Sequence, residues 1–203
     1  TVELFAKDDL FIPDHKKIEE LAETRNFSVE DEAIINEILL SLKSNYSMPF
    51  DWSKQEANYL KKTPESNWID YILYRFKFSE YPKRLIKTEF PIYIKIEPAS
   101  SCNLRCVMCF QVDKSFTRKP HMGIMDFELF KTVIDSAEAG GTKAITLGSR
   151  GEPTLHPKLP EMLAYMKGKF TEIKLITNAT RLTENLAHAI LKNNVGMMVY
   201  SID

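Results

Sequence analysis

Residues 92–109 read Ile-Tyr-Ile-Lys-Ile-Glu-Pro-Ala-Ser-Ser-Cys-Asn-Leu-Arg-Cys-Val-Met-Cys. The first five alternate in side-chain character and are rich in strand formers, so they predict a β-strand. The last eight contain all three cysteines of the 203-residue chain, with the spacing C-x3-C-x2-C. The sequence therefore places three thiols in the loop that follows a strand.

Three closely spaced thiolates can bind three irons of a cubane [4Fe-4S] cluster and leave the fourth iron open. A disulfide framework does not suit an odd number of cysteines that would close only very short loops. A Cys3His zinc site with His121 or His156 as the fourth ligand is an alternative, although structural zinc sites usually bring their ligands as two short-spaced pairs. A closed ferredoxin-type cluster would need a fourth thiolate, which the chain lacks.

From Pro91 onward, strand-like runs alternate with helical patterns. Helices are expected after the caps Asp126 and Thr183 and over residues 159–166. Glycines end the first two of these three helices in chain order, at Gly140-Gly141 and at Gly168. Such a βαβ series makes its strands parallel. The fold class predicted is α/β, with four parallel strands that include residues 92–96, 144–147, 173–176 and 197–202.

Parallel strands place the loops after their carboxyl ends on one edge of the sheet, where ligands and catalytic groups usually lie. The cysteines follow the first predicted strand and residues 148–153 follow the second. Thr177 and Asn178 end the third, and Ser201 with Asp203 ends the fourth. We expect these four segments to converge.

Residues before about 90 have a different, helical pattern. Ser28 is a plausible helix cap, and apolar residues then recur at three and four up to Lys43. Residues 66–78 predict a second helix with too many aromatic side chains for a single stripe, which indicates packing on more than one side. We interpret residues 1–88 as an α-helical N-terminal extension.

Composition sets broad limits on the function. The formal net charge is −1 and no long block of like charge occurs, so the sequence lacks the basic footprint of a nucleic-acid-binding protein. No apolar stretch is long enough to span a bilayer, and we expect no membrane partner. A reducing cytoplasm is the expected location, because it suits unpaired thiols and an oxygen-sensitive cluster.

The cysteine window resembles the signature of the radical S-adenosylmethionine (SAM) enzymes, and the resemblance extends from about Phe90 to the last residue. It implies a partial (βα) barrel, with residues 89–203 as a radical SAM core that is incomplete at its C-terminus. Cys102, Cys106 and Cys109 would bind a [4Fe-4S] cluster whose open iron is chelated by SAM. The implied reaction is reductive cleavage of SAM to a 5′-deoxyadenosyl radical that takes hydrogen from a substrate, with electrons from a flavodoxin or ferredoxin type of donor.

The resemblance also assigns contacts with SAM. One residue would lie beside the adenine, a glycine-containing segment would approach the amino group through its backbone, and the ends of strands three and four would complete the site. Arg150 and Ala179 depart from the family pattern, since glycine is usual at both positions. Arg150 has two readings, a contact with a carboxylate or simple packing across the edge of the sheet. The residues assigned are Met108, Gly151, Glu152, Thr177, Asn178, Ser201 and Asp203.

No catalytic acid or base is assigned, and His156 is expected to cap or pack at the next helix. Relatives close six βα units, so we expect the parent chain to continue beyond Asp203, into an auxiliary-cluster domain of the SPASM or twitch type. The aromatic lead-in that ends at Glu89-Phe90-Pro91 resembles that of enzymes encoded among cell-surface polysaccharide genes and suggests a small-molecule, sugar-linked substrate. Alternatives are a peptide-modifying maturase, a zinc-binding module and a catalytically silent homologue.

Overall fold

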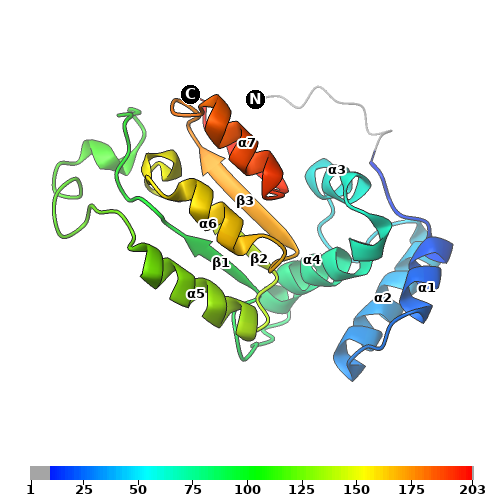
Figure 1. Cartoon of the computed structure of the whole chain (residues 1–203). Helices are drawn as coiled ribbons and strands as arrows, with labels where there is room; N and C mark the ends of the chain where they lie inside the picture. Colours follow the sequence, from blue (N-terminus) through cyan, green and yellow to red (C-terminus); the bar gives the residue numbers. More distant parts are fainter. Residues whose placement is uncertain (1–9, 203) are drawn as a thin grey trace. The chain divides into compact units, whose positions relative to one another are not determined.

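The computed structural model describes residues 10–202, which form two compact units that divide between Lys87 and Thr88. The first unit is helical and the second is α/β (Figure 1). None of the helices in the described part is long and apolar enough to cross a membrane.

From residue 10 onward, the helical unit contains four helices and a short 3-10 turn. Ser28 accepts a hydrogen bond from the Asp31 N–H, which confirms it as a helix cap, and that helix ends where Tyr46 adopts a left-handed φ of 50°. The last helix is longer than predicted because it continues through Pro82. The bounds are α1 His15–Glu23, α2 Val29–Asn45, α3 Lys54–Lys62, η2 Glu65–Asn67 and α4 Trp68–Lys83.

Aromatic residues of α4 are buried on several sides of the helix, as their number predicted. Tyr71, Tyr74 and Phe76 are each at most 2% exposed, and they point in directions too far apart for one stripe. Tyr71 stacks on Tyr59 of α3, with ring centroids 4.4 Å apart, and Phe76 meets Phe50 edge-on. These rings therefore form the core of this unit.

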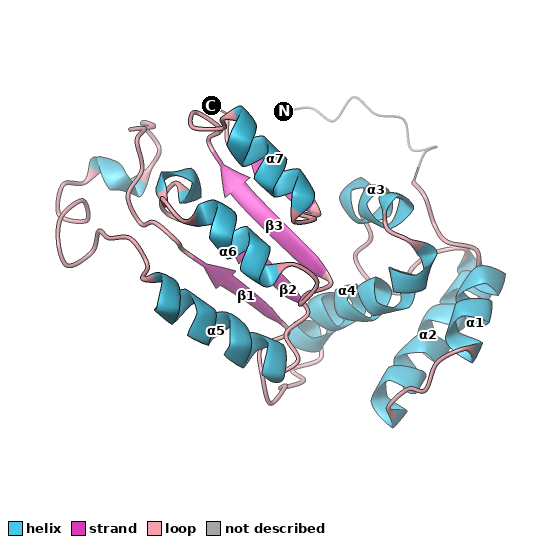
Figure 2. Cartoon of the chain, in the orientation of Figure 1, coloured by secondary structure: helices cyan, strands magenta, loops and turns pink. Residues whose placement is uncertain are grey.

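The second unit has the predicted α/β fold with four parallel strands, of which β1, β2 and β3 are labelled in Figure 2. The strands lie in the order of the chain, and their registers align Ile96, Leu147 and Leu175 across the first three. The fourth strand is shorter than predicted, since its ladder stops opposite Thr177. The bounds are β1 Tyr93–Ile96, β2 Ala144–Leu147, β3 Glu172–Thr177 and β4 Met197–Tyr200.

Helices cross over between these strands and lie on one face of the sheet (Figure 1), as right-handed crossovers between consecutive strands require. Asp126 and Thr183 cap their helices as predicted. Apolar side chains of helices and strands meet in one core, which includes Phe130, Ile145, Leu163, Leu175 and Ile190. The elements are η3 Phe110–Val112, α5 Phe127–Ala139, η4 Pro153–Leu155, α6 Leu159–Met166 and α7 Glu184–Lys192.

Candidate functional site

The carboxyl ends of the four strands share one edge of the sheet, and the predicted site segments lie there. Ser101 accepts a hydrogen bond from the Glu152 N–H over 2.8 Å, which joins the loop after β1 to the loop after β2. Ser201 donates its N–H to the Thr177 carbonyl at 2.9 Å, which joins the ends of β4 and β3. Asp203, the last residue assigned to this site, lies outside the described residues.

The three cysteines are free thiols, and each is partly exposed. The Cys109 N–H donates to the Cys106 carbonyl at 2.9 Å, so these two residues begin and end one tight turn. The sulfur of Cys109 accepts from the Gln111 N–H at 3.4 Å, and the sulfur of Cys102 accepts from the Leu104 N–H at the same distance. N–H donors to sulfur are typical partners of the thiolates that hold iron–sulfur clusters.

The donor set fits a cluster bound by three thiolates with one iron open, because three unpaired thiols stand on one loop and no fourth accompanies them. The thiols are not already gathered as a metal site, since no group of three His, Cys, Asp or Glu within residues 10–202 is arranged to hold an ion. The loop contains no helix or strand between β1 and η3, so its side chains are not constrained by a regular element.

Glu97, directly after β1, was not singled out from the sequence, yet it organises the loop after β2. One of its carboxylate oxygens accepts from the Arg150 N–H at 2.6 Å and from the Gly151 N–H at 2.9 Å. The only sequence feature that could have pointed to Glu97 is its position as an acidic residue at the end of a predicted strand. The partners lie more than fifty residues away in the chain, so the sequence could not reveal them.

Gly151 is required by the contact between these two loops. A Cβ at this position would lie 2.0 Å from the Ala99 carbonyl oxygen and 2.6 Å from the Ser100 carbonyl carbon. The sequence explained this glycine by close approach to a ligand, but the close approach seen in the structure is to the main chain beside the cysteine loop. The Gly151 carbonyl oxygen accepts no hydrogen bond from the described residues, which leaves it available to an amine donor.

The Glu152 side chain ties the loop after β2 to the end of β3. It is 2% exposed. Its Oε1 accepts from the Thr177 hydroxyl at 2.7 Å and from both the N–H and the hydroxyl of Thr154, while its Oε2 accepts from the Asn178 N–H at 2.7 Å. The carboxylate is therefore fully used within the protein, and the Glu152 side chain positions Thr177 and Asn178 rather than facing solvent.

Asn178 connects the end of β3 to the cysteine loop. Its Nδ2 lies 3.6 Å from the Cys102 sulfur and 3.0 Å from the Asn103 side-chain oxygen. Its Oδ1 accepts from the N–H and hydroxyl of Thr180. Ala179 adopts a φ of 60°, a conformation that favours glycine and accounts for glycine at this position in the family pattern. Asn178 thus serves both as a turn residue and as a partner of a predicted cluster ligand.

Met108 and Arg150 differ in their surroundings. Met108 is 68% exposed, so its side chain is accessible at the position assigned to the adenine. The Arg150 guanidinium lies over the Phe110 ring, 5.8 Å from its centroid. The packing reading of Arg150 agrees with this arrangement, and its contact with a carboxylate of SAM or substrate stays a prediction.

Gln111 holds the end of the cysteine loop in place by hydrogen bonds, and it was not identified from the sequence. Its Nε2 donates to the Ser100 carbonyl at 2.9 Å and to the Arg150 carbonyl at 2.8 Å. The side chain is 2% exposed, and its Oε1 is buried without a hydrogen-bond partner. Glutamine in a polar loop carries no sequence signal, so only the fold reveals this bridge.

His156 packs at the start of α6, as expected, and its two ring nitrogens are both engaged. Nε2 meets the Met125 carbonyl at 2.8 Å, so it must donate there, and Nδ1 accepts from the Lys158 N–H at 3.0 Å. The ring is therefore a neutral Nε2–H tautomer. Because the ring is only 4% exposed, His156 could become a zinc ligand only by losing these bonds.

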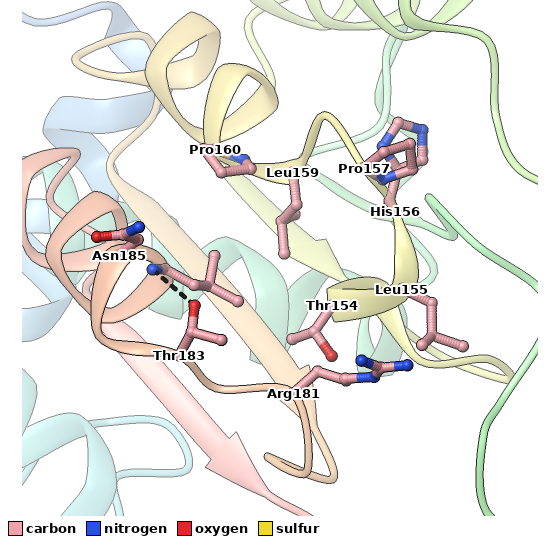
Figure 3. A pocket seen from close by; sticks show the side chains of 10 residues that line it. Thr154, Leu155, His156, Pro157, Leu159, Pro160, Arg181, Thr183 and Asn185 are labelled. Atoms are coloured by element: carbon pink, nitrogen blue, oxygen red, sulfur yellow. Dashed lines mark hydrogen bonds between the residues drawn. The ribbon is translucent and has the colours of Figure 1, made fainter.

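A hollow of about 400 Å³ lies between the starts of α6 and α7 (Figure 3). Thr154 and His156 line it from one loop, and Arg181 lines it from the other. Thr183 beside it accepts from the Leu186 N–H at 3.3 Å, which is the cap of α7. The hollow contains none of the cysteines and none of the residues assigned to SAM, so it is separate from the candidate cofactor site.

Comparison with known proteins identifies relatives of the second unit. A tungsten-containing aldehyde ferredoxin oxidoreductase cofactor-modifying protein from Pyrococcus furiosus is 34% identical over 112 residues, which cover 55% of this chain and 30% of that protein. A GTP 3′,8-cyclase from Pelotomaculum thermopropionicum is 32% identical over 113 residues, 55% of this chain and 34% of the cyclase. The mycofactocin maturase MftC of Mycobacterium tuberculosis is 29% identical over 113 residues, 56% of this chain and 28% of the maturase. The chain thus spans about a third of the length of these relatives.

Among solved structures, the crystal structure of BtrN in complex with AdoMet and 2-DOIA matches with a TM-score of 0.49 and 21% identity, covering 56% of this chain and 46% of BtrN. The model of the radical SAM superfamily matches residues 96–203, which is more than half of the chain. Enzymes of this family use a [4Fe-4S] cluster and SAM. The chain therefore belongs to the radical SAM superfamily.

Proposed function

We propose that Cys102, Cys106 and Cys109 hold the [4Fe-4S] cluster of a radical SAM enzyme. The observation that carries this proposal is the placement of the only three thiols of the chain on the loop after β1, beside the Gly151 and Asn178 segments. When bound, the cluster and SAM supply the one-electron reductive cleavage that generates a 5′-deoxyadenosyl radical for hydrogen abstraction.

The same edge of the sheet supplies the groups for SAM. The free Gly151 carbonyl suits the SAM amino group as an acceptor, and the exposed Met108 side chain offers an apolar surface for the adenine. Glu152 and Thr177 are buried and hold this edge in shape, so they act by positioning. Ser201 completes the edge at the end of β4, and Asp203 remains a prediction.

The substrate we propose is a sugar-linked small molecule, which the lead-in of residues 89–91 supports. A second candidate is maturation of a peptide, which the match to a maturase favours. The proposed setting is the reducing cytoplasm, with a flavodoxin or ferredoxin type of protein as the electron donor.

Anaerobic reconstitution with iron and sulfide tests this function. We expect uptake of both, and 5′-deoxyadenosine formation from SAM when dithionite is added. Each single variant Cys102→Ala, Cys106→Ala and Cys109→Ala should abolish that product. Val107→Ala should keep it, because Val107 is 89% exposed in the same loop and leaves all three thiols in place.

Two results would replace the proposal with its alternatives. Bound zinc without acid-labile sulfide would identify a zinc module. A stable cluster that yields no 5′-deoxyadenosine would identify a catalytically silent homologue.

A further inference from the structure

The segment that runs from within the cysteine loop to residue 121 is strongly basic compared with the rest of the chain. Residues 105–121 contain four cations, Arg105, Lys114, Arg118 and Lys119, against the single acid Asp113, which gives a net charge of +3. Since the whole chain has a net charge of −1, the other residues sum to −4. The charge of the protein is thus polarised towards the proposed cluster site.

These four cations have no acidic partner among the residues that the structure describes. Within residues 10–202, no ion pair involves Arg105, Lys114, Arg118 or Lys119. By contrast, Lys169 in the same unit is paired with both Asp135 and Glu138. Unpaired cations that cluster on one surface create a positive potential that attracts an acidic partner.

Apolar side chains lie among these cations. Val112 is 52% exposed and Phe116 is 45% exposed. A hollow of about 590 Å³ is lined by Arg105, Gln111, Val112, Lys114, Thr117 and Arg118, so cations and an apolar side chain border the same depression. Exposed apolar groups surrounded by polar ones are typical of interaction sites.

The basic loop, residues 112–121, is joined directly to the cysteine loop. It begins three residues after Cys109, and Gln111 between them donates its N–H to the Cys109 sulfur. Figure 1 shows the segment between β1 and α5 projecting beyond the sheet. A partner that binds this loop therefore comes close to the proposed cluster, which is what a protein that delivers electrons requires.

We propose that the basic loop, with Arg105, is the docking surface for an acidic one-electron carrier protein, the class to which flavodoxins belong. This inference rests on the proposed function, since it assumes a cluster on the three cysteines. Unpaired lysines and arginines steer the acidic carrier, and Val112 with Phe116 provides a small apolar contact. Small, salt-sensitive interfaces of this kind are typical of transient electron-transfer complexes.

The test measures binding of a purified bacterial flavodoxin to the reconstituted chain by biolayer interferometry. Wild-type affinity should fall at least about tenfold when NaCl is raised from about 50 mM to about 300 mM, because exposed charges are screened. The triple variant Lys114→Glu/Arg118→Glu/Lys119→Glu should weaken binding by about tenfold or more at the lower salt. The milder Lys114→Gln/Arg118→Gln/Lys119→Gln variant should lose an intermediate amount of affinity for flavodoxin. It keeps the test valid if the charge-reversed variant fails to fold.

The matched control is Lys143→Glu/Lys167→Glu/Lys192→Glu. These exposed lysines lie before β2 and at the ends of α6 and α7, at the opposite edge of the sheet, and the variant has the same change in net charge. It should bind flavodoxin within about twofold of wild type.

Equal losses in the two charge-reversed triples, or no binding by wild type, would overturn the docking surface. The proposal would also be overturned if wild type bound a DNA duplex or phosphatidylserine vesicles more tightly than it binds flavodoxin, and if the basic-loop triple variant lost that binding. Iron and sulfide content, measured on the same preparations, tests the proposed function separately. A chain that lacks the cluster is thereby distinguished from a chain that has the cluster and does not bind flavodoxin.

Discussion

At the scale of single residues, the candidate site depends on side chains that bind other loops. Glu97, Gln111 and Glu152 each join two segments that are distant in sequence. Because each accepts or donates at least two hydrogen bonds, the cysteine loop and the loop after β2 are held against each other. Residues of this kind hold in place the loops that carry the proposed cofactor ligands.

Glu152→Gln tests this positioning. An amide in place of the buried carboxylate puts an N–H group opposite a donor of Asn178 or of the threonines, so a bond is lost and two donors face each other. We expect a loss of about 1–3 kcal/mol in the free energy of unfolding, measured by urea denaturation. Glu161→Gln on the exposed side of α6 is the control and should leave that free energy unchanged. An unchanged Glu152→Gln variant would show that the carboxylate does not hold this edge.

Gly151→Ala tests the contact between the two loops. The added methyl would overlap the Ala99 carbonyl, which belongs to the main chain and cannot rotate away. We expect a loss of about 1–3 kcal/mol in unfolding free energy, as for other overpacked sites. Gly123→Ala is the matched control, because a Cβ there meets nothing within 4 Å. Equal stability of the two variants would contradict the close approach.

At the scale of elements, the starts of helices could be predicted from their capping residues. Asp126 and Thr183 cap α5 and α7 as predicted, since a cap acts on N–H groups two or three residues away. The limits of α4 and β4 were wrong, because the helix continues through Pro82, next to the buried Glu80 and Tyr81, and the strand ends where its ladder with β3 ends. The bridges made by Glu97 and Gln111 could not be predicted, because they join residues about forty to fifty positions apart.

The cap of α5 predicts a pH dependence. Hydrogen bonds, chiefly from the Leu129 N–H, lower the pKa of Asp126 below its ordinary value of 3.8. A lowered pKa in the folded state contributes stability that is complete above 3.8 and is lost as the pH falls through the lowered value. Asp126→Asn keeps a capping oxygen without the charge, so it should be less stable than wild type near about pH 6, and the difference should vanish towards about pH 2. Urea midpoints at the two pH values measure this, and a difference that grows in acid would refute it.

At the scale of the whole molecule, the helical unit and the α/β unit each contain a buried core of their own. Tyr71 and Phe76 fill the first, and Phe130 with Leu163 fills the second. The proposed assignment of residues 1–88 as an extension and 89–203 as the radical SAM core implies that each unit keeps its own local stability. A substitution in one core should then leave the other core protected.

Hydrogen exchange followed by mass spectrometry can test this independence. Leu60→Ala in α3 and Leu163→Ala in α6 remove matched, fully buried side chains, each expected to cost about 2–5 kcal/mol. Leu60→Ala should speed amide exchange in α1 to α4 and leave β2, β3 and α6 as protected as in wild type. Leu163→Ala should do the reverse. Faster exchange throughout both units in either variant would mean that they unfold as one, because local openings would then be coupled to a single global transition.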